Sequence, residues 1–517
     1  MTPAPGPDRA ELILRLRSGA VFVFIALPWL NPFAFGPSPA VIPWLLTMAS
    51  LALVLLWAGQ VRLAELAPSA WLTAALISAV LGLLQYFGVS AAFDPWVNTT
   101  AVGEAFANLR QRNQFATLTS IGMASLLGWA ARLQAQPAWH TDAQRRGRSA
   151  LLAAAAALLS FGNAASSSRT GTVQLLLLLA LAFVWGSWRQ SGPRRVLLSA
   201  ALAYGLAALL LPRLAGLDAH ATGILVRLQR GDPLCGSRLT LWSNVLHLIG
   251  QKPWFGWGWG ELEYAHFITL YPGPRFCDIL DNAHNLPLHL AVELGLPFTL
   301  LACSGAVWAV WRARPWCEQD ATRQLAWTVM AVILLHSMLE YPLWYGPFQV
   351  AFGLSLWLLW RSRRTSVPPS SELRPAPWLA FATSAILLGG SGCAAWDYYR
   401  VSQIYMSPQQ RAPAYRHNTL EKIGDSWLFE NQVRFARLTT ATLTRENARE
   451  LHDLAQALLH FSSEPSVVEM LIESATVLGL DDEVRFYLPR YRAAFPDEHA
   501  RWAQKIAGTP ATQVQLK

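Results

Sequence analysis

The apolar positions of this chain gather into long blocks that are separated by short polar connections. An apolar run of roughly 17 to 25 residues is long enough to cross a bilayer as a helix. Runs near this length, together with two shorter ones, predict about eleven membrane spans. The predicted spans are residues 19–35, 41–59, 71–87, 115–131, 150–162, 171–188, 196–211, 286–311, 325–344, 348–360 and 378–394. The predicted fold class is therefore an all-α polytopic membrane protein.

Two stretches interrupt this pattern. Residues 212–285 contain no spanning run and form a long predicted loop, whereas residues 396–517 are charged and amphipathic. In the second stretch apolar residues recur at helical spacing, as at Leu451, Leu454 and Leu458. We expect an N-terminal segment at 1–18, a membrane domain at 19–395 and a helical domain at 396–517. This last domain either packs on the membrane domain or recognises a partner, and the sequence leaves both readings open.

Composition and charge narrow the class of protein. The chain has 517 residues, of which 53% are hydrophobic and only 14% charged, and this composition excludes a water-soluble enzyme. Arginines occur in alternate connections, which stay in the cytoplasm by the positive-inside rule; they include Arg62, Arg132, Arg189, Arg312 and Arg361. The loop and the tail then lie outside, which in a bacterium is the periplasm. The net charge of +9 is mostly topological, so we expect no nucleic-acid partner.

Two cysteines share the predicted outer loop. An oxidising compartment would join Cys235 to Cys277, although a pair of free thiols is the alternative. Arg238 and His284 each lie a few residues from one of these cysteines, so a disulfide would draw them together.

His284 is the first candidate for chemistry. Leu286 and Pro287 follow it, and a proline just inside a helix start places the histidine at the N-terminal end of a helix. The positive end of the helix dipole disfavours imidazolium, so a neutral imidazole here is suited to act as a general base. His289 and Glu293 are four residues apart and can face one another on that helix. An ordinary interfacial histidine is the alternative.

Arginines on the outer face contradict the usual charge bias. Arg112 opens one predicted span, Arg169 lies between two spans, and Arg238 lies in the long loop. A lipid-anchored and strongly anionic ligand such as a polyprenyl diphosphate would explain them, because guanidinium groups bind phosphate oxygens through paired hydrogen bonds. Interfacial arginines that extend their heads to water are the alternative.

Several short motifs together resemble a known family. They are Arg112-Asn113-Gln114-Phe115-Ala116, Ser168-Arg169-Thr170-Gly171, Gly236-Ser237-Arg238, Pro253-Trp254-Phe255-Gly256-Trp257-Gly258, Ala283-His284-Asn285, Glu293-Leu294-Gly295 and His336-Ser337-Met338-Leu339-Glu340-Tyr341. In this order and on one face, they resemble the bacterial O-antigen ligase superfamily, and most closely its protein O-oligosaccharyltransferase (pilin glycosylation) branch.

The resemblance implies an enzyme of the bacterial inner membrane that works on the periplasmic side. It would transfer a preassembled glycan from undecaprenyl diphosphate to a hydroxyl of a pilin-like protein, with inversion and without a cofactor. His284 would activate the acceptor hydroxyl, and Arg169, Arg238 and Arg112 would hold the diphosphate. Secondary pocket residues would be Asn113, Gln114, Asn285, His289, Glu293, His336, Glu340 and Tyr341. Because the outer motifs lack an Asp-x-Asp pair, we also expect no metal.

Three rival functions remain open. An O-antigen polymerase would use another lipid-linked glycan as acceptor, and a lipopolysaccharide ligase would use the lipid A-core sugar. A transporter or flippase would also need arginines for an anionic headgroup, but it should contain internal repeats and needs no general base.

Overall fold

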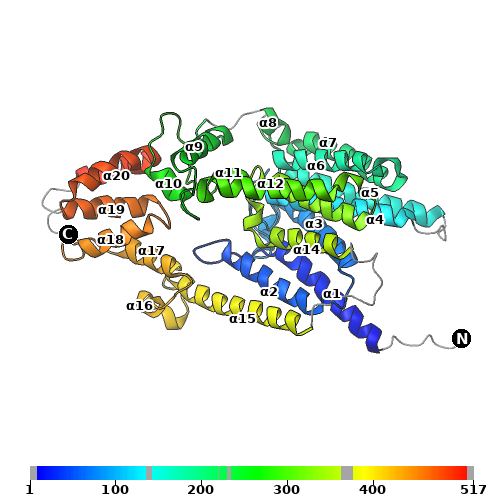
Figure 1. Ribbon diagram of the computed structural model, residues 1–517, viewed down its shortest axis with the longest axis horizontal. Helices are drawn as coiled ribbons and strands as arrows, with labels where there is room; N and C mark the ends of the chain where they lie inside the picture. Colours follow the sequence, from blue (N-terminus) through cyan, green and yellow to red (C-terminus); the bar gives the residue numbers. More distant parts are fainter. Residues whose placement is uncertain (1–8, 136–141, 219–220, 230–233, 363–376, 509–517) are drawn as a thin grey trace. The chain divides into compact units, whose positions relative to one another are not determined.

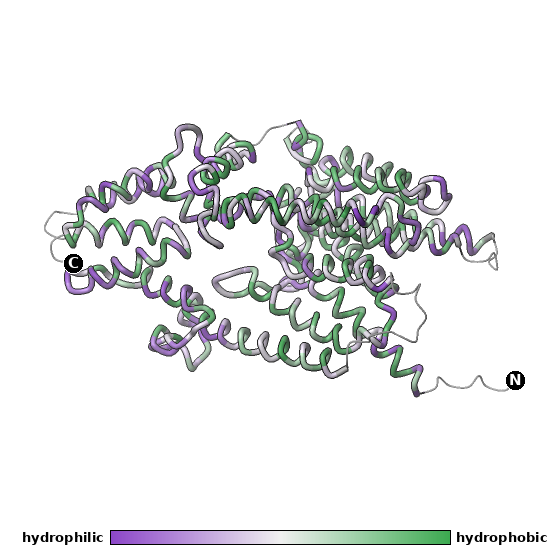
Figure 2. The backbone as a smooth tube through the Cα atoms, in the orientation of Figure 1, coloured by the Kyte–Doolittle hydropathy of each residue, from purple (hydrophilic) through white to green (hydrophobic). Residues whose placement is uncertain are grey.

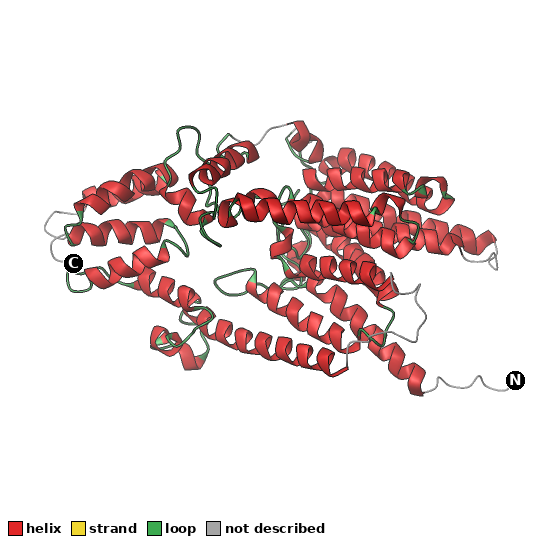
Figure 3. Cartoon of the chain, viewed as in Figure 1, coloured by secondary structure: helices red, strands yellow, loops and turns green. Residues whose placement is uncertain are grey.

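The computed structural model describes residues 9–135, 142–218, 221–229, 234–362 and 377–508. Every regular element among them is a helix, and no strand occurs in these ranges (Figure 3). The first eight residues of the predicted N-terminal segment and the last nine of the predicted tail lie outside the described residues. The chain divides into two compact units. Unit 1 is Met1–Ala34, Pro39–Arg230 and Val310–Cys393, and unit 2 is Phe35–Ser38, Gly231–Ala309 and Ala394–Lys517.

Unit 1 is a bundle of long apolar helices (Figure 1). They are α1 (Arg9–Leu30), α2 (Val41–Trp57), α3 (Leu63–Tyr86), α4 (Arg112–Ala135), α5 (Asp142–Ala165), α6 (Arg169–Val184), α7 (Ser191–Leu214), α8 (Ile224–Gln229), α13 (Ala321–Ser337) and α14 (Gly346–Ser362). Helix α3 packs on α1, α4 and α5 through fully buried alanines such as Ala75 and Ala79. A Cβ at Gly162 of α5 would lie only 2.8 Å from the Cβ of Ala79. Small residues therefore let these helices approach closely.

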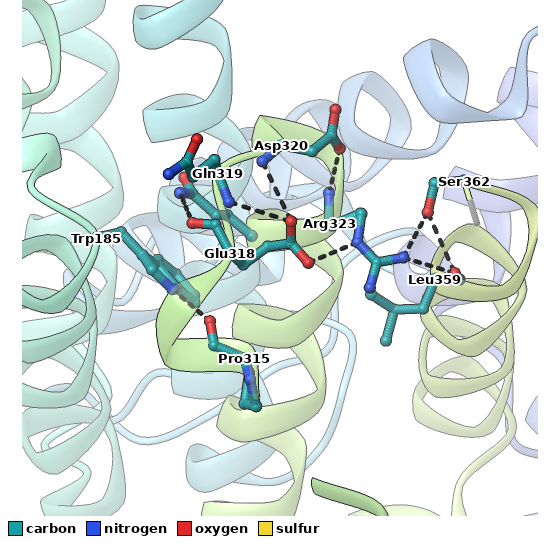
Figure 4. Close-up of polar contacts among 9 residues, drawn as sticks. Trp185, Pro315, Glu318, Gln319, Asp320, Arg323, Leu359 and Ser362 are labelled. Atoms are coloured by element: carbon teal, nitrogen blue, oxygen red, sulfur yellow. Dashed lines mark hydrogen bonds and ion pairs between the residues drawn. The ribbon is translucent and has the colours of Figure 1, made fainter. Parts of the chain in front are cut away.

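A polar cluster fastens the start of α13 (Figure 4). Asp320 caps the helix by accepting a hydrogen bond from the Arg323 backbone N–H at 2.9 Å. The Arg323 guanidinium bonds the Glu318 carboxylate, and it also donates to the Leu359 carbonyl and the Ser362 hydroxyl at 2.8 Å each. These last two residues belong to the end of α14, so the side chain of one arginine ties both helices together at this end of unit 1.

Unit 2 combines most of the predicted loop with the tail. Its helices are α9 (Arg238–Gln251), α10 (Leu262–Ile268), α11 (Leu286–Leu294), α16 (Thr419–Ile423), α17 (Glu430–Thr440), α18 (Ala448–Leu458), α19 (Pro465–Val477), α20 (Asp481–Ala494) and α21 (Pro496–Gly508). The tail is helical, as the sequence predicts. Phe267 of α10 is 2% exposed and lies in one apolar core with Leu451 and Tyr491 of the tail. Arg490 also donates to the Ile268 carbonyl at 2.6 Å.

Two helices, α12 (Leu296–Ala313) and α15 (Pro377–Ser402), run from one unit into the other. Among the described helices, five are long and apolar enough to cross a membrane: Leu63–Tyr86, Ala143–Ala165, Ser191–Leu214, Leu296–Cys317 and Trp378–Tyr405. Val41–Trp57 and Arg169–Val184 are shorter apolar helices. The predicted number of eleven spans is not confirmed. Figure 2 shows α2 and α15 largely green, whereas the tail helices alternate purple and green.

The structure changes two of the predicted spans. The predicted span 286–311 is interrupted after Leu294, because Gly295 adopts φ 85° and ψ 166°, which breaks the helix between α11 and α12. The predicted span 325–344 ends as a regular helix at Ser337, and a short 3₁₀ turn, Pro342–Trp344, follows after four residues that are not helical. A proline at the start of that turn cannot supply the backbone hydrogen bond that a continuing helix needs.

Candidate functional site

His284 lies in a tightly defined turn before α11. The Asn282 side chain accepts a hydrogen bond from the His284 backbone N–H at 2.9 Å, and His284 itself adopts φ 48°. Asn285 then caps α11 by accepting from the Leu288 N–H at 3.1 Å. Asparagine side chains form such local bonds readily, which explains why the Asn-Ala-His-Asn sequence folds this way. The imidazole is thus fixed between a turn and a helix start, and it remains half-buried.

Arg238 contacts this imidazole from the start of α9. Ser237 caps α9 by accepting from the Thr240 N–H at 3.2 Å, which makes Arg238 the first helical residue. Its guanidinium Nη1 lies 2.9 Å from His284 Nδ1. A guanidinium only donates hydrogen bonds, so Nδ1 is the acceptor and carries no proton in this contact. The two side chains thus lie in direct contact, whereas the sequence predicted their approach only as the consequence of a disulfide between Cys235 and Cys277.

His289 and Glu293 form a buried pair on α11, with 2% and 1% exposure. His289 Nε2 lies 3.4 Å from the Glu293 carboxylate, and Nδ1 accepts from the Ala283 N–H at 3.5 Å. Burial, and then the nearby His284, lower the pKa of His289 to about 4. Burial raises the pKa of Glu293 to about 7, although backbone hydrogen bonds from Gly260 and Leu262 oppose this. The contact with Glu293 is therefore a hydrogen bond from a neutral imidazole, whose other nitrogen accepts from the peptide bond between Asn282 and Ala283.

The segment Pro253-Trp254-Phe255-Gly256-Trp257-Gly258, here called the aromatic loop, is hydrogen-bonded to the junction of α11 and α12. Trp257 N–H donates to the Val292 carbonyl at 2.8 Å, Gly258 N–H to Glu293 at 3.0 Å, and Leu296 N–H to Pro253 at 2.8 Å. A Cβ at Gly295 would overlap the Trp254 carbonyl. Trp254 and Phe255 themselves are exposed. This loop therefore braces the helix that carries the His289–Glu293 pair.

A second group of predicted residues lies in unit 1, around the start of α6. Ser168 caps α6 by accepting from the Gly171 N–H at 3.0 Å, and Arg169 is the first helical residue. The Ser168 hydroxyl donates to Asn113 Oδ1 at 2.6 Å, and Asn113 Nδ2 donates to the Glu340 carboxylate at 3.1 Å. Gln111 donates to the other Glu340 oxygen at 3.2 Å. A chain of hydrogen bonds thus links Glu340 to the helix start that carries Arg169.

Deeper in this unit, a polar network is fully buried. The Thr117 hydroxyl lies 2.9 Å from His336 Nδ1, and Gln174 Nε2 donates to the same hydroxyl at 2.9 Å. Gln114 is 2% exposed, and its Nε2 has no hydrogen-bond partner among the residues that the structure describes. Tyr341 stacks on Tyr345 with ring centroids 5.9 Å apart. Polar side chains so deep in an apolar bundle hold one another in fixed positions.

The remaining predicted residues are placed as follows. Arg112 forms an ion pair with Glu104 at the start of α4. Arg112 and Arg169 belong to unit 1, whereas Arg238 and His284 belong to unit 2. Cys235 and Cys277 are free thiols, and the Cys277 backbone N–H donates to the Cys235 carbonyl at 3.2 Å.

Sequence reasoning missed two residues that shape these sites. Asn282 stands two positions before His284, which is the spacing of an Asx turn and was a usable signal. Gln174 is a single amide in a leucine-rich run, and its buried position gives it a structural role that only the neighbouring helices reveal.

Three family models match successive parts of the chain: "Protein glycosylation ligase" at residues 105–129, "O-Antigen ligase" at 154–303 and "Virulence factor membrane-bound polymerase, C-terminal" at 324–507. Arg169, Arg238 and His284 lie in the second match, and Glu340 in the third. A general O-oligosaccharyltransferase of Acinetobacter baylyi is 24% identical over 333 residues, covering 61% of this chain and 54% of the relative. A ComP-specific O-oligosaccharyltransferase of the same organism is 23% identical over 253 residues, covering 48% and 43%. The chain thus spans about half the length of these curated relatives.

Proposed function

Because this chain is a membrane protein related to the O-antigen ligase superfamily and to its protein-glycosylation branch, we propose that it is a protein O-oligosaccharyltransferase. It transfers a preassembled glycan from undecaprenyl diphosphate to serine or threonine hydroxyls of periplasmic proteins such as pilin. The enzyme lies in the bacterial inner membrane, with about eleven spans of bilayer length and a periplasmic active site. The contact between Arg238 and His284 at 2.9 Å carries the proposal, because it joins a base to a phosphate-binding cation.

In the proposed reaction, His284 removes the proton from the acceptor hydroxyl. The hydroxyl oxygen attacks the anomeric carbon from the side opposite the diphosphate, and a new glycosidic bond forms with inversion. The bond between that carbon and the diphosphate oxygen breaks, and its electron pair leaves with the diphosphate. Arg238 and Arg169 hold the departing group, with Arg112 as a further cation. Since negative charge grows on the diphosphate in the transition state, fixed guanidinium groups lower the barrier without a metal.

The resting contact also sets an order of events. While Arg238 donates to His284 Nδ1, that nitrogen cannot accept a proton from the acceptor. A bound diphosphate is a stronger acceptor for the guanidinium than a neutral imidazole is. Donor binding therefore draws Arg238 away and frees the base, so that acceptor activation follows donor binding.

Other predicted residues act by positioning. Asn285 and the His289–Glu293 pair hold the turn around His284. Asn113 and Glu340 hold the α6 start that carries Arg169. Gln114, His336 and Tyr341 line or support this same region of unit 1 in the proposal.

The test is glycan transfer by the purified protein with undecaprenyl-diphosphate oligosaccharide and pilin, in the presence of a chelator. His284→Ala should lower the rate by about 10² to 10⁴, which is the typical contribution of a general base. Arg238→Ala should lower it as well, while His417→Ala, at an exposed position of the tail, should leave it unchanged. Full activity of His284→Ala would refute the assigned role.

The match to a polymerase family model favours one second candidate, an O-antigen polymerase. It would use the same donor chemistry with a lipid-linked glycan as acceptor. In the assay above, lengthened lipid-linked glycan without glycosylated pilin would identify that activity, and glycan on added lipid A-core would identify a ligase.

A further inference from the structure

Cys235 and Cys277 lie side by side in unit 2, although the whole of α9 and α10 separates them in the sequence. The Cys277 backbone N–H donates to the Cys235 carbonyl at 3.2 Å. Both residues are exposed, so a soluble oxidant can reach them.

We infer that these two thiols, which are free in the structure, close into a disulfide that clamps the start of α9 to the segment leading to His284, and that this clamp preserves the placement of Arg238 beside His284. The bond itself rests on the periplasmic placement of the loop, and its positioning role rests on the proposed function.

The segment that carries Cys235 is fixed in place by the cap of α9. The Leu234 carbonyl accepts hydrogen bonds from the Thr240 hydroxyl at 2.6 Å and from the Ser237 hydroxyl at 3.1 Å. Thr240 is 6% exposed, so the bond from its hydroxyl is partly shielded from water. Cys235 therefore lies on a backbone that the first turn of α9 holds.

The segment that carries Cys277 is fixed to the same helix. Asn244 of α9, which is 3% exposed, accepts from the Phe276 N–H at 2.8 Å and donates to the Pro274 carbonyl at 3.0 Å. Helix α9 thus holds both the segment that carries Cys235 and the segment that carries Cys277. A disulfide needs Cα atoms within roughly 7 Å, and the direct backbone hydrogen bond from Cys277 to Cys235 keeps the two backbones close together.

The chemistry of closure balances with an external disulfide as oxidant, either a protein dithiol–disulfide oxidase or oxidised glutathione. The thiolate of one cysteine attacks the oxidant and forms a mixed disulfide, and the second cysteine then displaces the reduced oxidant. The two electrons and two protons leave with the oxidant as its dithiol form. Partial desolvation, and then the adjacent Cys235, raise the pKa of the Cys277 thiol to about 11, so little of its reactive thiolate is present at neutral pH and closure from this thiol is slow.

The clamp acts on the proposed site through short connections. Arg238 follows Cys235 by three positions at the helix start, and the chain from Cys277 leads through Asn282 to the turn of His284. A covalent bond at this point limits how far the two segments separate when Arg238 moves to the diphosphate. A shift of about 1 Å in a reacting group can cost up to about 10²-fold in rate, so loss of the clamp should lower transfer.

The test begins with the bond itself. The full chain is isolated from membranes, alkylated without reductant and digested. We expect a peptide containing Cys235 linked to one containing Cys277, while Cys303, Cys317 and Cys393 carry the alkyl group. Alkylation of both Cys235 and Cys277 before reduction would overturn the inference. This result does not depend on any enzymatic activity, so it stands apart from a failure of the proposed function.

The positioning role is tested by transfer rates in Cys235→Ser, Cys277→Ser and the double variant, with Cys303→Ser as the matched control. All three should lose activity to the same extent, by roughly 10-fold on the scale of small geometric displacements, and Cys303→Ser should not. Gentle reduction of the native protein should reproduce the loss, which guards against a folding defect of the variants. Unchanged transfer in all three variants, with the bond present in the native protein, would overturn the positioning role.

Discussion

Replacement of Gly295 by alanine tests whether the backbone at the junction of α11 and α12 lies against that of Trp254. Gly295 adopts φ 85° and ψ 166°, a region that is nearly restricted to glycine. A Cβ there would lie 2.5 Å from the carbonyl carbon of Trp254 and would overlap its oxygen. The aromatic loop must therefore shift, and the bonds that it makes with α11 and α12 are at risk.

The loss of stability in Gly295→Ala is the sum of the backbone strain and the cost of the hydrogen bonds that break. Backbone strain of this kind costs about 1 to 3 kcal/mol, and each lost hydrogen bond costs about 1 kcal/mol. With one or two of the three junction bonds broken, unit 2 should lose about 2 to 5 kcal/mol of stability. At roughly 2 to 4 °C per kcal/mol for a cooperative unit of 150 to 250 residues, the thermal midpoint should fall by roughly 5 to 20 °C.

Thermal unfolding of the purified protein, followed by tryptophan fluorescence and by resistance to proteolysis, measures this shift. Gly305→Ala is the matched control, because Gly305 lies inside α12 and a Cβ there would meet nothing within 4 Å. The control should melt at the native temperature or slightly above it. A Gly295→Ala protein that melts within about 2 °C of the control, which is less than 1 kcal/mol on the same scale, would refute the close backbone approach.

Three further substitutions have defined outcomes. Burial raises the pKa of Glu263 to about 7, so its contribution to stability is present below its unfolded value of about 4.5 and is lost as the pH rises through about 7; Glu263→Gln should flatten the pH dependence of the thermal midpoint between pH 5 and pH 8. Arg323→Ala leaves the partly buried Glu318 without its cation and removes charge-assisted hydrogen bonds, which should cost about 1.5 to 3 kcal/mol, whereas Arg15→Ala, at an exposed pair, should cost less than about 1 kcal/mol in the same unfolding assay. Asn285→Ala removes the α11 cap at about 1 kcal/mol, which faster hydrogen exchange at the first turn of α11 should report, and Asn285→Asp should retain protection.

Residue spacing within a few positions predicted the geometry of α11, the helix that follows His284. The four-residue spacing of His289 and Glu293 predicted that they face one another, and they lie 3.4 Å apart. The proline after His284 predicted a helix start, and α11 begins at Leu286. These features depend on helix periodicity and capping, which act within a few residues.

Features set by distant segments were not predictable in this way. The apolar run through Gly295 looks continuous, and it breaks because a loop more than thirty positions earlier supplies backbone partners to it. Asn113 and Glu340 meet across separate helices, and neither one's local sequence indicates the other. The arrangement of the loop and the tail as one unit likewise depends on tertiary packing.

The packing of α10 has a consequence for chimeric proteins. Phe267 occupies the core of the tail helices, Arg490 bonds the Ile268 carbonyl, and Glu263 accepts from the Ser463 backbone. The tail therefore completes its core with a segment that precedes it by more than a hundred residues. A tail grafted from one relative onto another at residue 396 would meet a foreign helix in its own interior, so a stable graft requires that residues 262–268 travel with the tail.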